Sequence, residues 1–142
     1  MVIAVNFDGT IVENAYPKIG RELPHAVDVL GSLAREGHRI ILWTARTGRP
    51  LEDALLWCRL NGIVLYAVNS NTANLPLHSG VEVLPAGRQP GILEKSPKIT
   101  ADIFIDGNNV GGLPSWPEIH ELISGKAQRR QALLRRRSKR SM

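Results

Sequence analysis

Short apolar runs alternate with segments of helical periodicity along the first half of the chain. The runs at 2–7, 39–43 and 63–68 have the length and composition of buried strands, while segments 24–36 and 50–61 place their apolar residues on one helical face. Strands that alternate with helices in this order favour a parallel sheet with right-handed crossovers. The pattern therefore predicts an α/β, three-layer Rossmann-like domain around a central, mostly parallel sheet of four or five strands.

The second half of the chain is less regular. Residues 69–97 scatter Asn, Ser, Gly and Pro among a few apolar residues, so this segment is functional, ordered by short elements of its own, or mobile. Residues 101–105 have the character of a fourth strand, and residues 116–123 open a last helix. The length suffices for one core and is too short for two ordinary domains. We expect one domain over residues 1–125.

The positive charge of the chain is concentrated at its C-terminal end. The formal net charge is +5, yet eight of the eighteen basic residues lie in the last seventeen positions, where there is no acid, so the rest of the chain carries 5 − 8 = −3. Residues 126–142 are therefore predicted to form a separate basic tail. This tail is either a solvated, partly disordered segment or one that binds nucleic acid through counterion release.

Targeting and membrane signals are not apparent in the sequence. No basic segment followed by an apolar stretch opens the chain, and no run of about eighteen apolar residues occurs. We expect a soluble, cytoplasmic protein with no membrane partner. The lone cysteine, Cys58, falls in an apolar helical pattern and is predicted to be a core residue.

Polar and charged side chains follow the predicted strands at the point where each strand ends. They are Asn6 and Asp8 after the first strand, Thr44 and Arg46 after the second, and Asp106 after the fourth, with Lys98 shortly before it. Because ligands collect at the carboxyl ends of parallel strands, we expect these residues to share one site. Hydroxyl, cation and carboxylates are the groups that phosphoryl transfer requires.

These motifs resemble those of the haloacid dehalogenase-like (HAD-like) superfamily, and in particular its small capless hydrolases. The first motif stands as Asn6-Phe7-Asp8-Gly9-Thr10, and the second as Thr44 at the end of an apolar strand. Lys98, with Lys95 as the runner-up, matches the upstream lysine, and Asp106-Gly107 matches half of the acidic pair that forms the fourth motif. The resemblance covers residues 1–124.

The resemblance implies a phosphorylated substrate and a role for each motif residue. Asn6 occupies the nucleophile position, and Asp8 that of the acid that protonates the leaving group and then activates water. Thr44 and Lys98 would hold and neutralise the phosphoryl group, and Gly9, Thr10 and Arg46 would contact the substrate. Mg²⁺ would lie at Asn6, Asp106 and the backbone carbonyl of Asp8.

Two departures from the family pattern bear on activity. The neutral amide of Asn6 removes the covalent route and one negative metal ligand, and Gly107 stands where a second acid would be. The sequence therefore predicts an impaired or inactive phosphohydrolase with weakened Mg²⁺ binding; the alternative is a non-catalytic domain that binds phosphoesters or nucleic acid. Asn6 is an engineered substitution, the mark of a natural pseudoenzyme, or part of a site in which Asp8 directs water to phosphorus.

The size of the body predicts an open site. About 125 residues leave no room for a large cap, so the site faces solvent unless residues 69–97 or the second subunit of a homodimer cover it. Open-sited relatives accept bulky phosphoesters, and the basic tail would suit a nucleic-acid phosphate as substrate.

Overall fold

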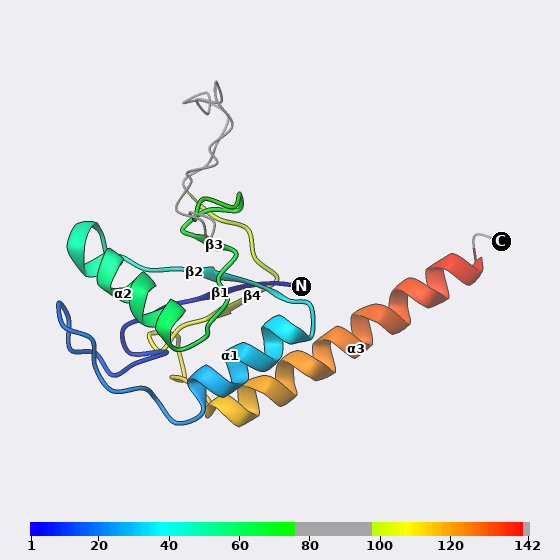
Figure 1. Ribbon diagram of the computed structural model, residues 1–142. Helices are drawn as coiled ribbons and strands as arrows, with labels where there is room; N and C mark the ends of the chain where they lie inside the picture. Colours follow the sequence, from blue (N-terminus) through cyan, green and yellow to red (C-terminus); the bar gives the residue numbers. More distant parts are fainter. Residues whose placement is uncertain (76–97, 141–142) are drawn as a thin grey trace, which may run out of the picture.

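The described part of the fold contains four short strands and three helices. A computed structural model describes residues 1–75 and 98–140. Within them the elements are β1 (Val2–Val5), α1 (Ala26–Arg35), β2 (Arg39–Leu42), α2 (Gly48–Leu60), β3 (Ala67–Val68), β4 (Ile103–Ile105) and α3 (Trp116–Arg140) (Figure 1).

The strands form one parallel sheet in the order β3-β2-β1-β4. Strand β1 lies at the centre, with Ile3 opposite Ile40 of β2 and Ile103 of β4. Ala4 and Val5 are fully buried, as expected for apolar strands with covered faces in a parallel sheet. The predicted α/β, Rossmann-like class with a parallel central sheet is confirmed.

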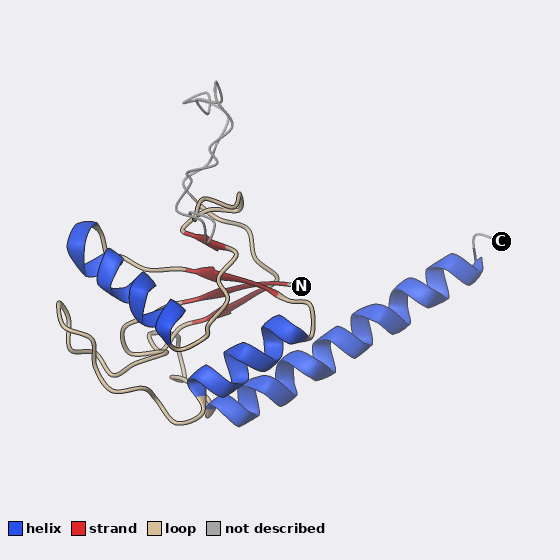
Figure 2. Cartoon of the chain, in the orientation of Figure 1, coloured by secondary structure: helices blue, strands red, loops and turns tan. Residues whose placement is uncertain are grey.

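The two faces of the sheet belong to different apolar clusters. Alternate side chains, including Ile3 and Val5, share a large core cluster with all three helices, which therefore cover this face (Figure 2). The opposite face carries a smaller cluster around Ala4 and Ile41, and Ile99, from the segment that leads into β4, packs there. The alternation of side chains along a strand thus divides the core into two layers of side chains.

Strand β3 is shorter than the sequence pattern predicts. Ala67 and Val68 pair with Ile41 and Leu42, and continuing this register places residues 63 and 64 ahead of the four residues that β2 offers for pairing. Ile63 is nevertheless buried in the core cluster. An apolar run indicates that a segment is buried, but not that it forms hydrogen bonds with a neighbouring strand. The predicted strand over 63–68 was therefore wrong in its first part.

Helix α3 continues well beyond the predicted last helix. It runs through the charge boundary at 125/126 without a break and ends at Arg140, so the basic segment up to that residue is helical (Figure 1). This stretch lacks proline and is rich in Arg, Gln, Ala and Leu, all good helix formers. In the described part of the chain, neither α3 nor another helix combines the length and apolar character that a membrane crossing demands.

Candidate functional site

The turns that follow β1, β2 and β4 meet at the carboxyl edge of the sheet. The Asn6 amide nitrogen donates to Oδ1 of Asp106 at 3.2 Å, which joins the ends of β1 and β4. Two nitrogens of Arg46 donate to the carboxylate of Asp8, which joins the ends of β1 and β2. Four of the predicted site residues therefore lie in one connected polar network.

The Asn6 amide has a fixed orientation within this network. Its Oδ1 accepts a hydrogen bond from the Phe7 backbone N–H at 2.9 Å, and its nitrogen donates at 3.2 Å to the Asp8 carbonyl as well as to Asp106. Turning the amide over would set two donors against each other at Phe7 and two acceptors against each other at Asp106. Its NH₂ group therefore points at the two remaining oxygens of the predicted metal site.

These residues do not fit a Mg²⁺ ion. The amide nitrogen of Asn6 stands between the Asp8 carbonyl and Asp106, and it supplies hydrogen-bond donors where a cation would need oxygen ligands. The neighbouring Asp8 carboxylate is committed to Arg46. Across residues 1–75 and 98–140, no three His, Cys, Asp or Glu side chains gather into a metal-binding group.

Asp8 is paired with Arg46 through two short hydrogen bonds. Nε and one terminal nitrogen of Arg46 each donate at 2.7 Å, one to each carboxylate oxygen, and the Asp8 side chain is 17% exposed. Planar, bidentate pairs of this kind are among the strong hydrogen-bonded contacts of proteins, because the bonds are charge-assisted. A proton on either oxygen of Asp8 would break one of the two bonds.

Arg46 is a buried cation whose donors are all used. Besides the two bonds to Asp8, its terminal nitrogens donate to the backbone carbonyls of Pro17, Lys18 and Pro50 at 2.8–3.1 Å. The side chain is 2% exposed, and its hydrogen bonds to Asp8 raise the pKa of the guanidinium further. Arg46 therefore ties the loop that contains Lys18 to the start of α2, and its five N–H groups already have protein acceptors.

Thr44 is held in place by Asn69, a residue that the sequence reasoning missed. The Asn69 side chain accepts from the Thr44 N–H at 2.9 Å and donates to the Thr44 carbonyl at 2.8 Å. The Thr44 hydroxyl oxygen accepts from the backbone N–H of Arg46. Asn69 has a φ of +49°, a conformation that asparagine tolerates well, so an Asn directly after a strand was the available signal.

Gly107 lies where two backbone segments come too close for a side chain. A Cβ at this position would collide with the carbonyl oxygen of Gly9, and the Gly107 N–H donates to the buried Thr10 hydroxyl at 2.9 Å. The Trp116 indole N–H donates to the Thr10 carbonyl at 3.0 Å, which fastens the same turn to α3. Thr10 is therefore committed to joining the turns after β1 and β4, and this packing leaves no room for a second acid at 107.

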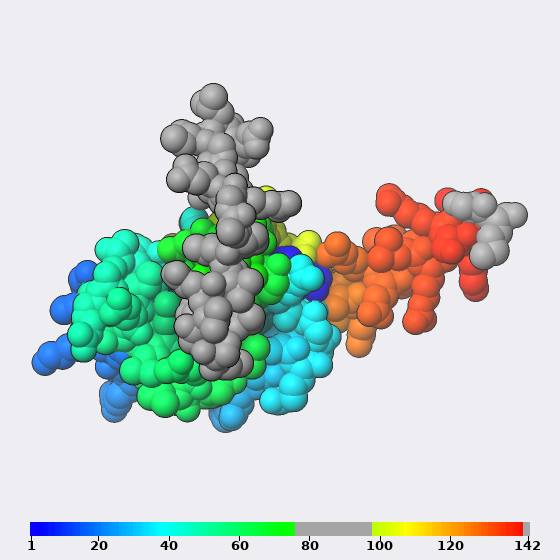
Figure 3. Space-filling view, turned by 45° about the horizontal axis from the view of Figure 1, so that its top comes forward, coloured from blue at the N-terminus to red at the C-terminus, as the bar shows by residue number. Residues whose placement is uncertain are grey.

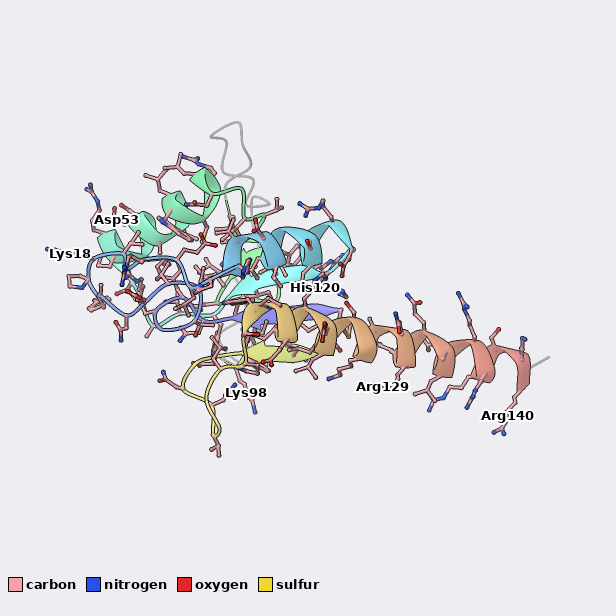
Figure 4. The ribbon with its side chains drawn as sticks, turned by 90° about the horizontal axis from the view of Figure 1, so that it is seen from below. Lys18, Asp53, Lys98, His120, Arg129 and Arg140 are labelled. Atoms are coloured by element: carbon pink, nitrogen blue, oxygen red, sulfur yellow. The ribbon has the colours of Figure 1, made fainter. Side chains whose placement is uncertain are left out.

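Lys98 is exposed and lies in the segment leading into β4 (Figure 4). The adjacent Ile99 packs against the second face of the sheet. That Lys98 shares a site with Asn6, Asp8 and Asp106 stays a prediction. Lys95 lies outside the described residues, as does most of the 69–97 segment, one of the two candidates for covering a site that we otherwise expect to be open.

Comparison with known proteins gives a family without a stated activity. No protein-family model and no curated protein sequence matches the chain. A solved structure, that of a conserved protein coded by a locus from Bacteroides thetaiotaomicron, matches with 44% sequence identity and a TM-score of 0.72, over 89% of this chain and 91% of that one. The chain therefore belongs to the same family as this conserved Bacteroides thetaiotaomicron protein.

Proposed function

We propose that this chain is a HAD-like phosphohydrolase domain whose hydrolytic centre is inactive as it stands, and that it works as a non-catalytic binding domain. The observation that carries the proposal is the position of the Asn6 amide. Its nitrogen donates to the two oxygens, on Asp8 and Asp106, that the family resemblance assigns to Mg²⁺. Hydrogen-bond donors thus take the place of the cation, and a neutral amide takes the place of the attacking carboxylate.

The pairing of Asp8 supports the same conclusion. A general acid must carry a proton and release it to the leaving group. Both oxygens of Asp8 accept from Arg46 at 2.7 Å, and moving Asp8 away would leave a buried guanidinium without its counter-charge, at a cost of about 3–5 kcal/mol. A route in which Asp8 alone directs water to phosphorus meets the same obstacle.

Gly107 favours a naturally inactive domain over an engineered one. A substitution designed to trap a ligand would change Asn6 alone and leave the acidic pair intact. Here Gly107 is required by the close approach of the Gly9 carbonyl, so the turn is adapted to the absence of a second acid. The two departures from the family pattern are then independent features of one inactive centre.

Hydrolysis of a generic aryl phosphate with Mg²⁺ tests the proposal. We expect the parent to match the buffer blank and to show no heat of binding with Mg²⁺ in calorimetry. The variant Asn6→Asp restores the carboxylate, and we expect it to bind Mg²⁺. Parent hydrolysis that disappears in Asp8→Asn would overturn the claim of inactivity. Asn6→Asp that binds no Mg²⁺ would instead overturn the assignment of the site by family resemblance.

A further inference from the structure

The C-terminal half of α3 projects from the body as a basic arm, which we define as residues 126–140. All residues from 128 to 140 are exposed, and the space-filling view shows this part of α3 extending away from the body (Figure 3). The arm holds eight Lys and Arg residues and no acid. At 1.5 Å per residue it is about 21 Å long.

Most of the basic side chains share one face of the arm. At about 100° per residue, six of the eight lie within an arc of roughly 120°. These six, which we call the basic face, are Lys126, Arg129, Arg130, Arg136, Arg137 and Arg140. Figure 4 shows Arg129 and Arg140 on the same side of the helix. The other two, Arg135 and Lys139, lie on the opposite side.

The arm leaves the body at the edge of the sheet opposite the candidate site. Lys126 and Arg130 bind Asp102, through its carbonyl at 3.0 Å and its carboxylate at 2.9 Å, and Asp102 also accepts from the N–H of Val2. These contacts fix the arm at the amino ends of β1 and β4, whereas Asn6 and Asp106 follow their carboxyl ends. A polyanion on the arm would therefore not present a phosphate to the candidate site of the same molecule.

The charge and shape of the arm select among anionic partners. A helix that lies in a membrane needs a broad apolar face, but Leu133 and Leu134 are the large apolar side chains of residues 128–140, and no aromatic residue accompanies them. An acidic protein surface would need matched carboxylates at each position. A nucleic-acid duplex offers closely spaced phosphates along its whole length, and the DNA major groove is wide enough to admit a helix.

We propose that the basic arm binds the phosphate backbone of a nucleic-acid duplex, without reading its sequence, and holds the body clear of it. The body carries a net charge of −3 and is repelled by the same phosphates, which leaves the arm as the contact. Basic side chains near the helix C-terminus suit the helix dipole, yet an exposed segment of this length is only marginally helical alone. Bound phosphates would relieve the repulsion between its charges and raise its helicity. This inference does not rest on the proposed inactivity of the site.

Fluorescence anisotropy of the full chain with a labelled DNA duplex of about 20 base pairs, across a range of KCl concentrations, tests the proposal. The decisive variants are two matched pairs. Arg136→Gln with Arg140→Gln removes two charges from the basic face, and Arg135→Gln with Lys139→Gln removes two from the opposite side at the same helix end and spacing. A duplex of RNA, a single strand, phosphatidylserine vesicles and polyglutamate serve as competing ligands.

We expect the basic-face pair to lower the slope of log affinity against log salt by about 1.8 and to weaken binding roughly ten- to a hundredfold near 0.1 M salt. The pair on the opposite side, Arg135→Gln with Lys139→Gln, should change the slope and the affinity by less than half as much. Tighter binding of the RNA or the DNA duplex would identify the source of the phosphates within the proposal. The proposal is overturned if both pairs lose affinity equally, if polyglutamate, the vesicles or the single strand bind as tightly as the duplexes, or if the parent shows no salt-dependent binding.

Discussion

Replacing Asn6 with aspartate should make the stability of the fold depend on a divalent cation. In the parent, the amide nitrogen lies 3.2 Å from both the Asp8 carbonyl and Oδ1 of Asp106 and donates to each. In Asn6→Asp a carboxylate oxygen takes the place of that nitrogen, so three oxygens face one another. The bond from the Phe7 N–H remains, because either carboxylate oxygen accepts it.

The size of the effect follows from these distances. Two unit charges 3.2 Å apart repel by about 5 kcal/mol at an effective dielectric constant near 20 and by about 1 kcal/mol in bulk water. Position 6 and Asp106 are half-buried, so the repulsion lies between these values, and two lost hydrogen bonds add about 1 kcal/mol each. We expect a loss of about 3–7 kcal/mol without divalent cations, which lowers Tm by roughly 10 °C or more.

Mg²⁺ and protons should each reverse part of this loss. With a Kd of about 1 mM, ~10 mM Mg²⁺ would return about 1.4 kcal/mol. A proton shared by the carboxyl pair in the folded state raises its pKa there, so the deficit relative to the parent should shrink as the pH falls toward 4. Thermal unfolding in EDTA and in Mg²⁺ measures both effects. The exposed substitution Asn14→Asp, which keeps an oxygen for the Tyr16 N–H, is the matched control. A variant as stable as the parent in EDTA and indifferent to Mg²⁺ would refute the reasoning.

Three further predictions concern stability. Asp8→Asn should lower the free energy of unfolding by about 3–5 kcal/mol in urea titrations, because it leaves the buried Arg46 cation without its counter-charge; a loss below 1 kcal/mol would contradict the pairing. Gly107→Ala should cost about 2 kcal/mol or more because its Cβ meets a backbone carbonyl, whereas Gly31→Ala, inside α1 with only a flexible side chain in reach, should gain about 0.5–1 kcal/mol; equal effects would argue against the close approach. Burial, and then the neighbouring N-terminal ammonium, lower the pKa of His38 below its ordinary value of 6.5. The unfolded chain therefore binds the extra proton, and this contribution to stability is complete above pH 6.5 and lost as the pH falls through the folded-state pKa. Measuring the free energy of unfolding of His38→Gln and of the parent at pH 7.5 and 5.5 isolates the contribution of His38. A stability difference between the two proteins that is the same at both pH values would contradict this prediction.

The sequence predicted the layout of the fold because the fold rests on apolar periodicity. The strand at 39–43 and the helix at 24–36 were located to within a few residues of β2 and α1. The run at 63–68 was misjudged because pairing depends on the length of the neighbouring strand, which the run itself does not reveal. The helical continuation past residue 123 was missed because this segment has no apolar face against the body.

The sequence predicted that these side chains meet at one edge of the sheet, but it did not predict the hydrogen bonds between them. Strand ends identify Asn6, Asp8, Thr44 and Asp106 because a parallel sheet gathers its carboxyl ends at one edge. The role of Arg46 depends on three backbone carbonyls, two from one loop and one from the first turn of α2, and those positions exist only once the chain has folded. The amide orientation of Asn6 likewise depends on a neighbouring backbone N–H and on a carboxylate a hundred residues away.

The hydrogen bonding of the centre supports the inactivity proposed above. Catalysis relies on groups held ready for charge that develops only in the transition state, and such groups are poorly satisfied in the resting protein. Here Asn6 bonds to three protein groups, Arg46 uses all five donors, and in the described part of the chain every buried side-chain nitrogen and oxygen has a partner. A centre in this state contributes to stability, because it removes the repulsion that two facing carboxylates would create. The Asn6 amide links the ends of β1 and β4 directly, and Thr10 and Trp116 connect the same turns to the start of α3. Under the proposed function, this link takes the place of a bound cation.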